Sequence, residues 1–198
     1  MQKRLLIIAK AIKIVPLFFA LGLALPANAT PIVYTAILAG TNEVPPTGSA
    51  GTGSATFTLD GNLLTIDLSF SGLSAPASAG HIHCCAAAGT NAIVAVPFAG
   101  LPNATSGTYL NTVDLTLAAT YNPAFIAASG STVAGAETAF IAGLNSGNTY
   151  TNLHNANFPA GEIRGQLALS GVPEPSSLLL LGTGLVGIVQ TVRRRVRA

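Results

Sequence analysis

The basic residues of this 198-residue chain are confined to its two ends, where each group borders a short apolar run. Eight of the nine Lys and Arg residues flank the runs at residues 14–25 and 178–189, and only Arg164 lies between them. A basic cluster beside a short apolar run is typical of a segment that is recognised at a membrane. We therefore expect the folded domain within residues 30–170, which are enough for one hydrophobic core.

The charge of this central segment restricts its partners. One arginine stands against six carboxylates between residues 30 and 170, which gives a net charge of −5. Most nucleic-acid affinity comes from basic side chains that neutralise phosphates. Nucleic acid is therefore excluded as a partner.

The N-terminal segment has the three parts of a secretory signal peptide. Four basic residues precede the apolar run, and the small residues Ala27 and Ala29 follow it. Signal peptidase accepts small side chains at these two positions, so cleavage is predicted after Ala29, which removes residues 1–29. A retained membrane anchor is the alternative interpretation.

The C-terminal segment, residues 171–198, also has three parts in a fixed order. A motif at residues 172–177 contains Pro173-Glu174-Pro175, an apolar stretch follows at 178–192, and a basic tail at 193–198 ends the chain. The 15 residues 178–192 would form a helix of about 22 Å, so snorkelling arginines or a thinned bilayer would complete a transmembrane helix. The arginines should stay cytoplasmic.

This tail closely resembles the PEP-CTERM sorting signal of Gram-negative bacteria, with Pro173, Glu174 and Pro175 as its signature. The resemblance implies an inner-membrane-anchored precursor that an exosortase cleaves near the motif. The product would reach the cell surface or the exopolysaccharide matrix of a biofilm, or be secreted. The protein would then be a substrate of signal peptidase and exosortase, with matrix polysaccharide or surface components as further partners.

Short segments of alternating polarity predict β-strands through most of the central segment. Residues 56–59 and 64–70 alternate, and Asp60-Gly61 between them is a typical hairpin turn. The same alternation places Val113, Leu115 and Leu117 on an inward face. Further strands are predicted at residues 33–38, 80–85, 93–98, 109–117, 149–154 and 162–169.

Two helix signals interrupt these strands. Asn122-Pro123 predicts the start of a short helix, and Ser131 or Thr132 would cap a second one that ends at residues 145–147. The expected fold class is therefore all-β: a Greek-key β-sandwich or barrel-like domain with a short helical insertion. An N-terminal signal helix and a C-terminal membrane helix would flank it.

A second resemblance covers about residues 32–170. The central segment looks like a CHRD domain, the module named after chordin, whose members are all-β and whose biochemical activity is poorly defined. Asn155 and Ala160 depart from the usual family residues, and neither is a candidate ligand. The resemblance rests on ordered blocks at residues 34–40, 42–46, 81–83, 150–154 and 159–167.

The three histidines of the chain, His81, His83 and His154, all lie in this domain. Residues two apart on a strand share a face, so His81 and His83 should point the same way, with Ile82 opposite. A third imidazole from another strand would complete a site for one copper or zinc ion. The arrangement is similar to that of copper-zinc superoxide dismutases, which is an analogy only.

The alternative is that the histidines are hydrogen-bonded residues that brace loops, with Glu162 or Asn152 as partners. Glu162 and Arg164 are also two apart, so they could form a charge pair or hold the second nitrogen of a ligand histidine. Arg164 would otherwise pair with Glu43.

Cys84 and Cys85 are the only cysteines and follow the histidine pair directly. Three outcomes are open in an oxidising compartment: a disulfide between neighbours, bridges to another chain, or ligation of the metal by Cys85, which would share a face with His81 and His83. Two buried thiols are the structural alternative.

No catalytic residues are predicted, because the chain contains no G-x-S-x-G elbow, phosphate-binding loop or H-E-x-x-H motif. The sequence favours a non-enzymatic surface module that binds ligands or organises the matrix. The alternative is a copper- or zinc-binding extracytoplasmic protein, for which metal-dependent redox activity is a further hypothesis.

Overall fold

The computed structural model describes residues 30–171 and Arg193. The predicted signal peptide with Ala27 and Ala29, the sorting motif Pro173-Glu174-Pro175 and the predicted membrane helix lie outside these residues. No helix in the part of the chain that the structure describes is both long and apolar enough to cross a membrane.

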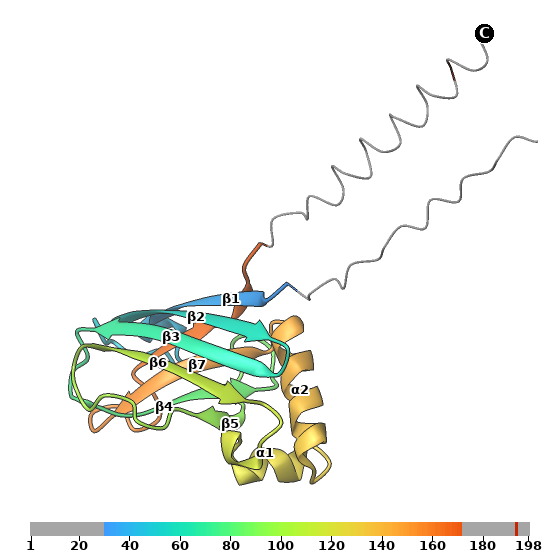
Figure 1. Cartoon of the computed structure of the whole chain (residues 1–198). Coiled ribbons are helices and arrows are strands. Elements are labelled where there is room, and N and C mark those ends of the chain that lie inside the picture. The colour runs from blue at the N-terminus through green and yellow to red at the C-terminus, as the bar shows by residue number, and fades with distance from the viewer. Residues whose placement is uncertain (1–29, 172–192, 194–198) are drawn as a thin grey trace, which may run out of the picture.

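The described residues form one antiparallel sheet that curls on itself (Figure 1). Its strands follow the order β5-β4-β7-β8-β1-β2-β3-β6, and β9 pairs with β1. The curl brings β1, β2, β3 and β6 opposite β4, β5 and β7. This confirms the all-β, barrel-like expectation. The strands are β1 (Ile32–Ala39), β2 (Thr52–Asp60), β3 (Leu63–Ser71), β4 (Ala77–Cys84), β5 (Ile93–Pro97), β6 (Gly107–Asp114), β7 (Thr149–Asn155), β8 (Ile163–Gln166) and β9 (Ala168–Leu169).

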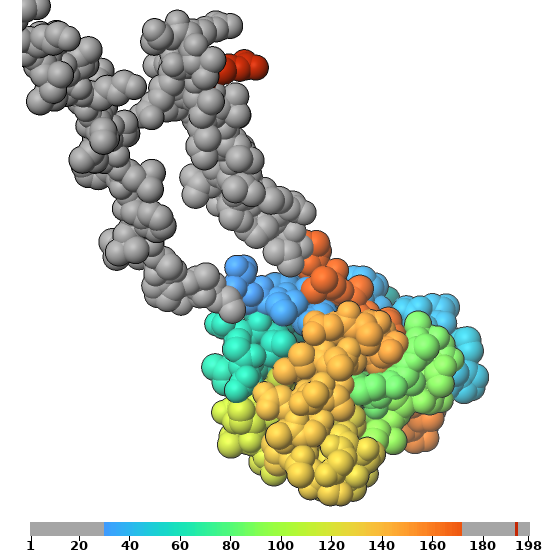
Figure 2. Space-filling view, turned by 90° about the vertical axis from the view of Figure 1, so that its right-hand side faces the viewer, coloured from blue at the N-terminus to red at the C-terminus, as the bar shows by residue number. Residues whose placement is uncertain are grey.

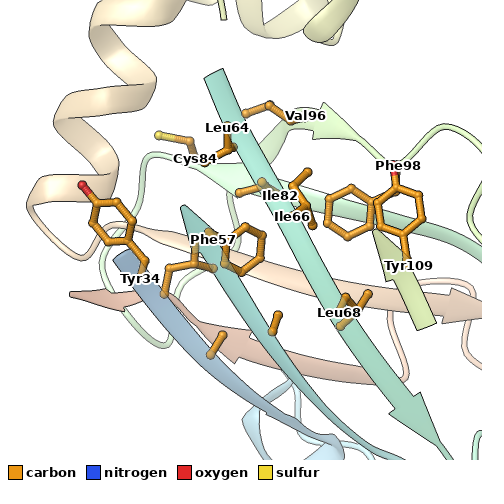
Figure 3. Close-up of a cluster of buried hydrophobic side chains, with 14 of the residues drawn as sticks. Tyr34, Phe57, Leu64, Ile66, Leu68, Ile82, Cys84, Val96, Phe98 and Tyr109 are labelled. Carbon is orange, nitrogen blue, oxygen red and sulfur yellow. The ribbon is translucent and has the colours of Figure 1, made fainter. Parts of the chain in front are cut away.

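The predicted hairpin is formed by β2 and β3, which pair from Thr52↔Ser71 to Asp60↔Leu63. Gly61 takes a positive φ of 57° in the turn, a backbone conformation that glycine adopts without a Cβ penalty. Alternate side chains of both strands point inward. Figure 3 shows these inward side chains of β3 packed with Ile82 of β4 in the core.

Two predicted strands differ in their bounds from the sequence prediction. Leu115 is buried as expected, but β6 stops at Asp114 and Leu117 is 54% exposed, so the inward placement of Leu117 is wrong. The Asp114 carboxylate accepts hydrogen bonds from the backbone and hydroxyl of Thr116, which closes a turn there. The strand predicted at 162–169 begins at Ile163 and is divided into β8 and β9.

Both predicted helices are present. Asn122 caps α1 (Pro123–Ala128), and Thr132 caps α2 (Val133–Asn145) through its hydroxyl. Each polar side chain accepts a backbone N–H that the first helical turn leaves free. The helices cover one end of the curled sheet, where α2 buries Phe140 and Leu144 (Figures 1 and 2).

Candidate metal centre

The three histidines come from two strands that pair in the middle of the sheet. His81 and His83 lie on β4, and His154 lies on β7, with Ala79 opposite His154 and Asn152 opposite His81. The predicted shared face of His81 and His83 is confirmed, because their ring centres are 5.6 Å apart. Ile82 between them points into the core. The histidines therefore occupy the outer face of β4 and β7.

The histidine side chains meet closely enough to share one ion. One ring nitrogen from each of His81, His83 and His154 lies within 4.8 Å of the other two. Nδ1 of His81 and Nε2 of His154 lie 3.2 Å apart. Residues 73 positions apart in sequence thus form a group of three, which was the expected ligand set.

Two backbone carbonyls fix which nitrogens are free to bind. Nδ1 of His83 lies 2.8 Å from the carbonyl oxygen of Ala92, and Nδ1 of His154 lies 3.0 Å from that of Pro159. A carbonyl only accepts hydrogen bonds, so both Nδ1 atoms carry the proton and donate it. In the neutral rings, both Nε2 atoms therefore present lone pairs to the cluster. Ligand histidines in metal sites are held in this way.

Burial keeps the three rings neutral. Loss of solvent, followed by the neighbouring His154 and His83, lowers the pKa of His81 to about 4. Burial is also the main cause that lowers the pKa of His83 and of His154. A metal ion binds the deprotonated imidazole, so at neutral pH it would displace few protons here.

An aromatic stack supports His83 from behind. The Tyr150 ring lies parallel to the His83 ring, with centres 4.5 Å apart. The Arg164 guanidinium carbon lies 3.3 Å from the centre of the Tyr150 ring. Arg164 also donates to Asn91 Oδ1 and to the Thr90 carbonyl. Arg164 thus reaches the cluster through Tyr150, an aromatic partner that was not expected from the sequence.

Glu162 lies apart from the histidines. It precedes β8 rather than sharing a strand face with Arg164, and it is fully buried. Its carboxylate accepts from the Ser49 hydroxyl, the Ser74 backbone and the Asn155 amide. The structure therefore gives Glu162 the role of joining loops, and does not make it a hydrogen-bond partner of a ligand histidine.

Cys85 does not join the cluster either. It forms a disulfide with its neighbour Cys84, so it has no thiolate to offer a metal. The sulfur atoms lie against α2, close to Gly143 and the carbonyl of Ala139. Strand β4 ends at Cys84, so the alternation that placed Cys85 beside the histidines does not reach it.

Asn152 is the polar neighbour that completes the group. Its Oδ1 lies 3.0 Å from Nε2 of His83 and 3.0 Å from Nε2 of His154. Asn152 was considered in sequence only as a hydrogen-bond partner of the histidines. The signal that could have found it is the period of two along β7, which puts Tyr150, Asn152 and His154 on one face.

The fold and the cluster define a curled all-β module with a buried polar site on the outer face of two central strands. The CHRD domain family model matches residues 34–167, so the chain belongs to the CHRD domain family. The PEP-CTERM protein-sorting motif matches residues 171–195. Neither a curated protein nor a solved structure matches the chain. The protein is thus an exported CHRD protein that is transiently anchored in the membrane and processed by an exosortase.

Proposed function

We propose that this surface protein binds one divalent transition-metal ion, copper or zinc, through His81, His83 and His154. The observation that supports this most strongly is the pair of Nδ1–H donations to Ala92 and Pro159, which leaves two Nε2 lone pairs directed at one point. Imidazole nitrogen suits both metals. The protein then acts as a binding module outside the cytoplasm rather than as an enzyme.

The alternative, in which the three histidines only hold loops in place through hydrogen bonds, explains less of the geometry. A purely structural set of histidines would pair each inward lone pair with a donor. Nδ1 of His81 can donate to Nε2 of His154, but Nε2 of His83 then faces only the Asn152 side chain. Buried acceptors that face acceptors are costly in a brace and expected in a metal site.

Metal content of the exported protein tests the proposal. The full chain, exported in a host supplied with copper or zinc and purified in detergent, should carry about one metal ion per chain by elemental analysis. The triple variant His81→Ala, His83→Ala, His154→Ala should carry none. The same metal content in both proteins, or none in the wild type under either supply, would contradict the proposal.

A further inference from the structure

A buried amide lies at the centre of the histidine cluster. Asn152 is 2% exposed and lies opposite His81 in the β4–β7 pairing. Its Oδ1 is equally close to Nε2 of His83 and Nε2 of His154. The amide group can turn about its bond to Cβ, so the surroundings of its nitrogen decide which way its oxygen faces.

Glu43 sets that orientation. It is 5% exposed, and its Oε1 lies on the same side as the Asn152 amide nitrogen, since a Cβ at Gly161 would meet both atoms. Oε1 of Glu43 has no hydrogen-bond partner that meets ordinary geometry among the described residues. The amide nitrogen lies on the Glu43 side and the amide oxygen lies on the histidine side, which is the orientation that gives an accepting carboxylate an N–H group. Burial raises the pKa of Glu43, and the nearby charge of Arg164 offsets part of that rise.

Gly161 closes the space around this pair. A Cβ at position 161 would collide with Oε1 of Glu43 and lie 2.8 Å from Nδ2 of Asn152. The backbone there has a φ of +128°, which favours glycine. The carboxylate and the amide are thus packed against the main chain, with little room for the amide to turn.

This orientation creates a conflict that a cation resolves. Oδ1 of Asn152 is an acceptor, and so is Nε2 of His83 and of His154. Nevertheless, Oδ1 lies 3.0 Å from each of these two nitrogens. Turning the amide would give the histidines a donor, but it would press the amide oxygen against the Glu43 carboxylate. Buried acceptors in contact repel one another, and a positive ion between them removes the repulsion.

Three separations between these atoms match those of atoms that share a metal. Two ligands about 2.0–2.1 Å from one ion lie about 2.9 Å apart at a right angle and about 3.4 Å apart at the tetrahedral angle. The two contacts of Asn152 measure 3.0 Å each, and the contact between His81 and His154 measures 3.2 Å. All three values fall within this interval.

We propose that Asn152 is the fourth ligand through Oδ1, and that Glu43 is a positioning residue that holds the amide. This inference rests on the proposed metal binding. The donor set is then three imidazole nitrogens and one carboxamide oxygen. A closed four-coordinate site is typical of a metal that is held rather than one that turns over substrate. The hard oxygen favours Zn²⁺ or Cu²⁺ over Cu⁺.

Copper titration of the metal-free full chain tests Asn152. Asn152→Leu should weaken Cu²⁺ binding by about 100-fold and change the electron paramagnetic resonance spectrum, because an oxygen ligand is lost. Asn152→Asp, which has almost the same shape, should bind Cu²⁺ more tightly and change the spectrum in another way. Asn111→Leu on the distant strand β6 is the matched control and should bind like the wild type.

Glu43 is tested with a conservative and a disruptive variant. Glu43→Gln keeps an oxygen that can accept from Asn152, so its copper affinity should stay within a few-fold of the wild type. Glu43→Leu should weaken binding by about 10-fold with the copper spectrum broadened. Equal losses in both variants would remove the positioning role from Glu43.

The outcomes separate this inference from the proposed function. If the wild type binds one Cu²⁺ and both Asn152 variants give its spectrum and affinity, the metal site stands and the fourth ligand is overturned. If the wild type binds no metal, the proposed function itself fails. Should Asn152→Leu not fold, the Asp variant alone decides, because an unchanged spectrum in that variant contradicts ligation.

Discussion

The two faces of the β4–β7 pair differ in what their buried side chains do. On the inner face, Ile82 and Leu153 pack in the hydrophobic core. On the outer face, His83 and Asn152 are also buried, yet Nε2 of His83 and Oδ1 of Asn152, both acceptors, face one another. Burial on the inner face stabilises the fold, whereas burial on the outer face leaves acceptor atoms without a hydrogen-bond donor. Buried polar atoms that the fold does not pair with one another therefore indicate a binding site.

Four substitutions should distinguish residues that stabilise the fold from residues that hold the metal. They are ordered by the expected loss in the free energy of unfolding of the metal-free protein. The largest loss is expected for Leu153→Ala on the inner face. Removal of a fully buried leucine side chain should cost about 2–5 kcal/mol in a denaturant titration. Metal content should stay at one ion per chain. Leu110→Ala, at a residue 73% exposed, should cost almost nothing.

Gly161→Ala should combine a smaller loss of stability with a loss of metal. The positive φ and the collision with Glu43 should cost about 1–3 kcal/mol, and copper affinity should fall because Asn152 is displaced. Gly100→Ala is the matched control, since its φ is +79° and open space surrounds it. An equal loss of copper affinity in both alanine variants would mean that backbone strain alone is responsible.

Arg164→Lys should affect stability more than metal binding. Lysine cannot reproduce both hydrogen bonds to Asn91 and Thr90 while its charge stays over Tyr150. The expected loss is about 1–2 kcal/mol by thermal or denaturant unfolding. Copper affinity should change less than tenfold, because Arg164 touches His83 only through Tyr150. A complete loss of metal would place Arg164 in the site itself.

His154→Gln should have the smallest effect on the metal-free protein and the clearest effect on its response to metal. Loss of the hydrogen bond to Pro159 should cost about 1 kcal/mol. In the wild type, free metal at 100 times its dissociation constant should add about 2.7 kcal/mol of stability. The variant should show almost none of this gain in paired melting curves, and a full gain would contradict ligation by His154.

The sequence predicts much of the fold because the decisive signals are local. Asp60-Gly61 marks the hairpin turn, and Asn122 and Thr132 cap the two helices where expected. The strand end at Asp114 was missed because the turn depends on a side-chain hydrogen bond to Thr116. Periodicity alone does not reveal such a bond.

The site was predictable only in part because its contacts are non-local. Strand alternation correctly predicts that His81 and His83 share a face. The pairing of β4 with β7, which brings Asn152 opposite His81, joins residues about 70 positions apart, and no local pattern specifies that register. The carbonyls of Ala92 and Pro159, which determine the tautomers, belong to backbone that carries no sequence signal.

The most direct test of the metal centre is a crystal structure of the processed protein with bound copper or zinc, recorded at the absorption edge of that metal. We predict one anomalous peak about 2.0–2.1 Å from a ring nitrogen of each of His81, His83 and His154, and at a similar distance from Oδ1 of Asn152. A peak located away from these side chains, or a donor nitrogen of Asn152 turned toward two unmetallated histidines, would contradict it.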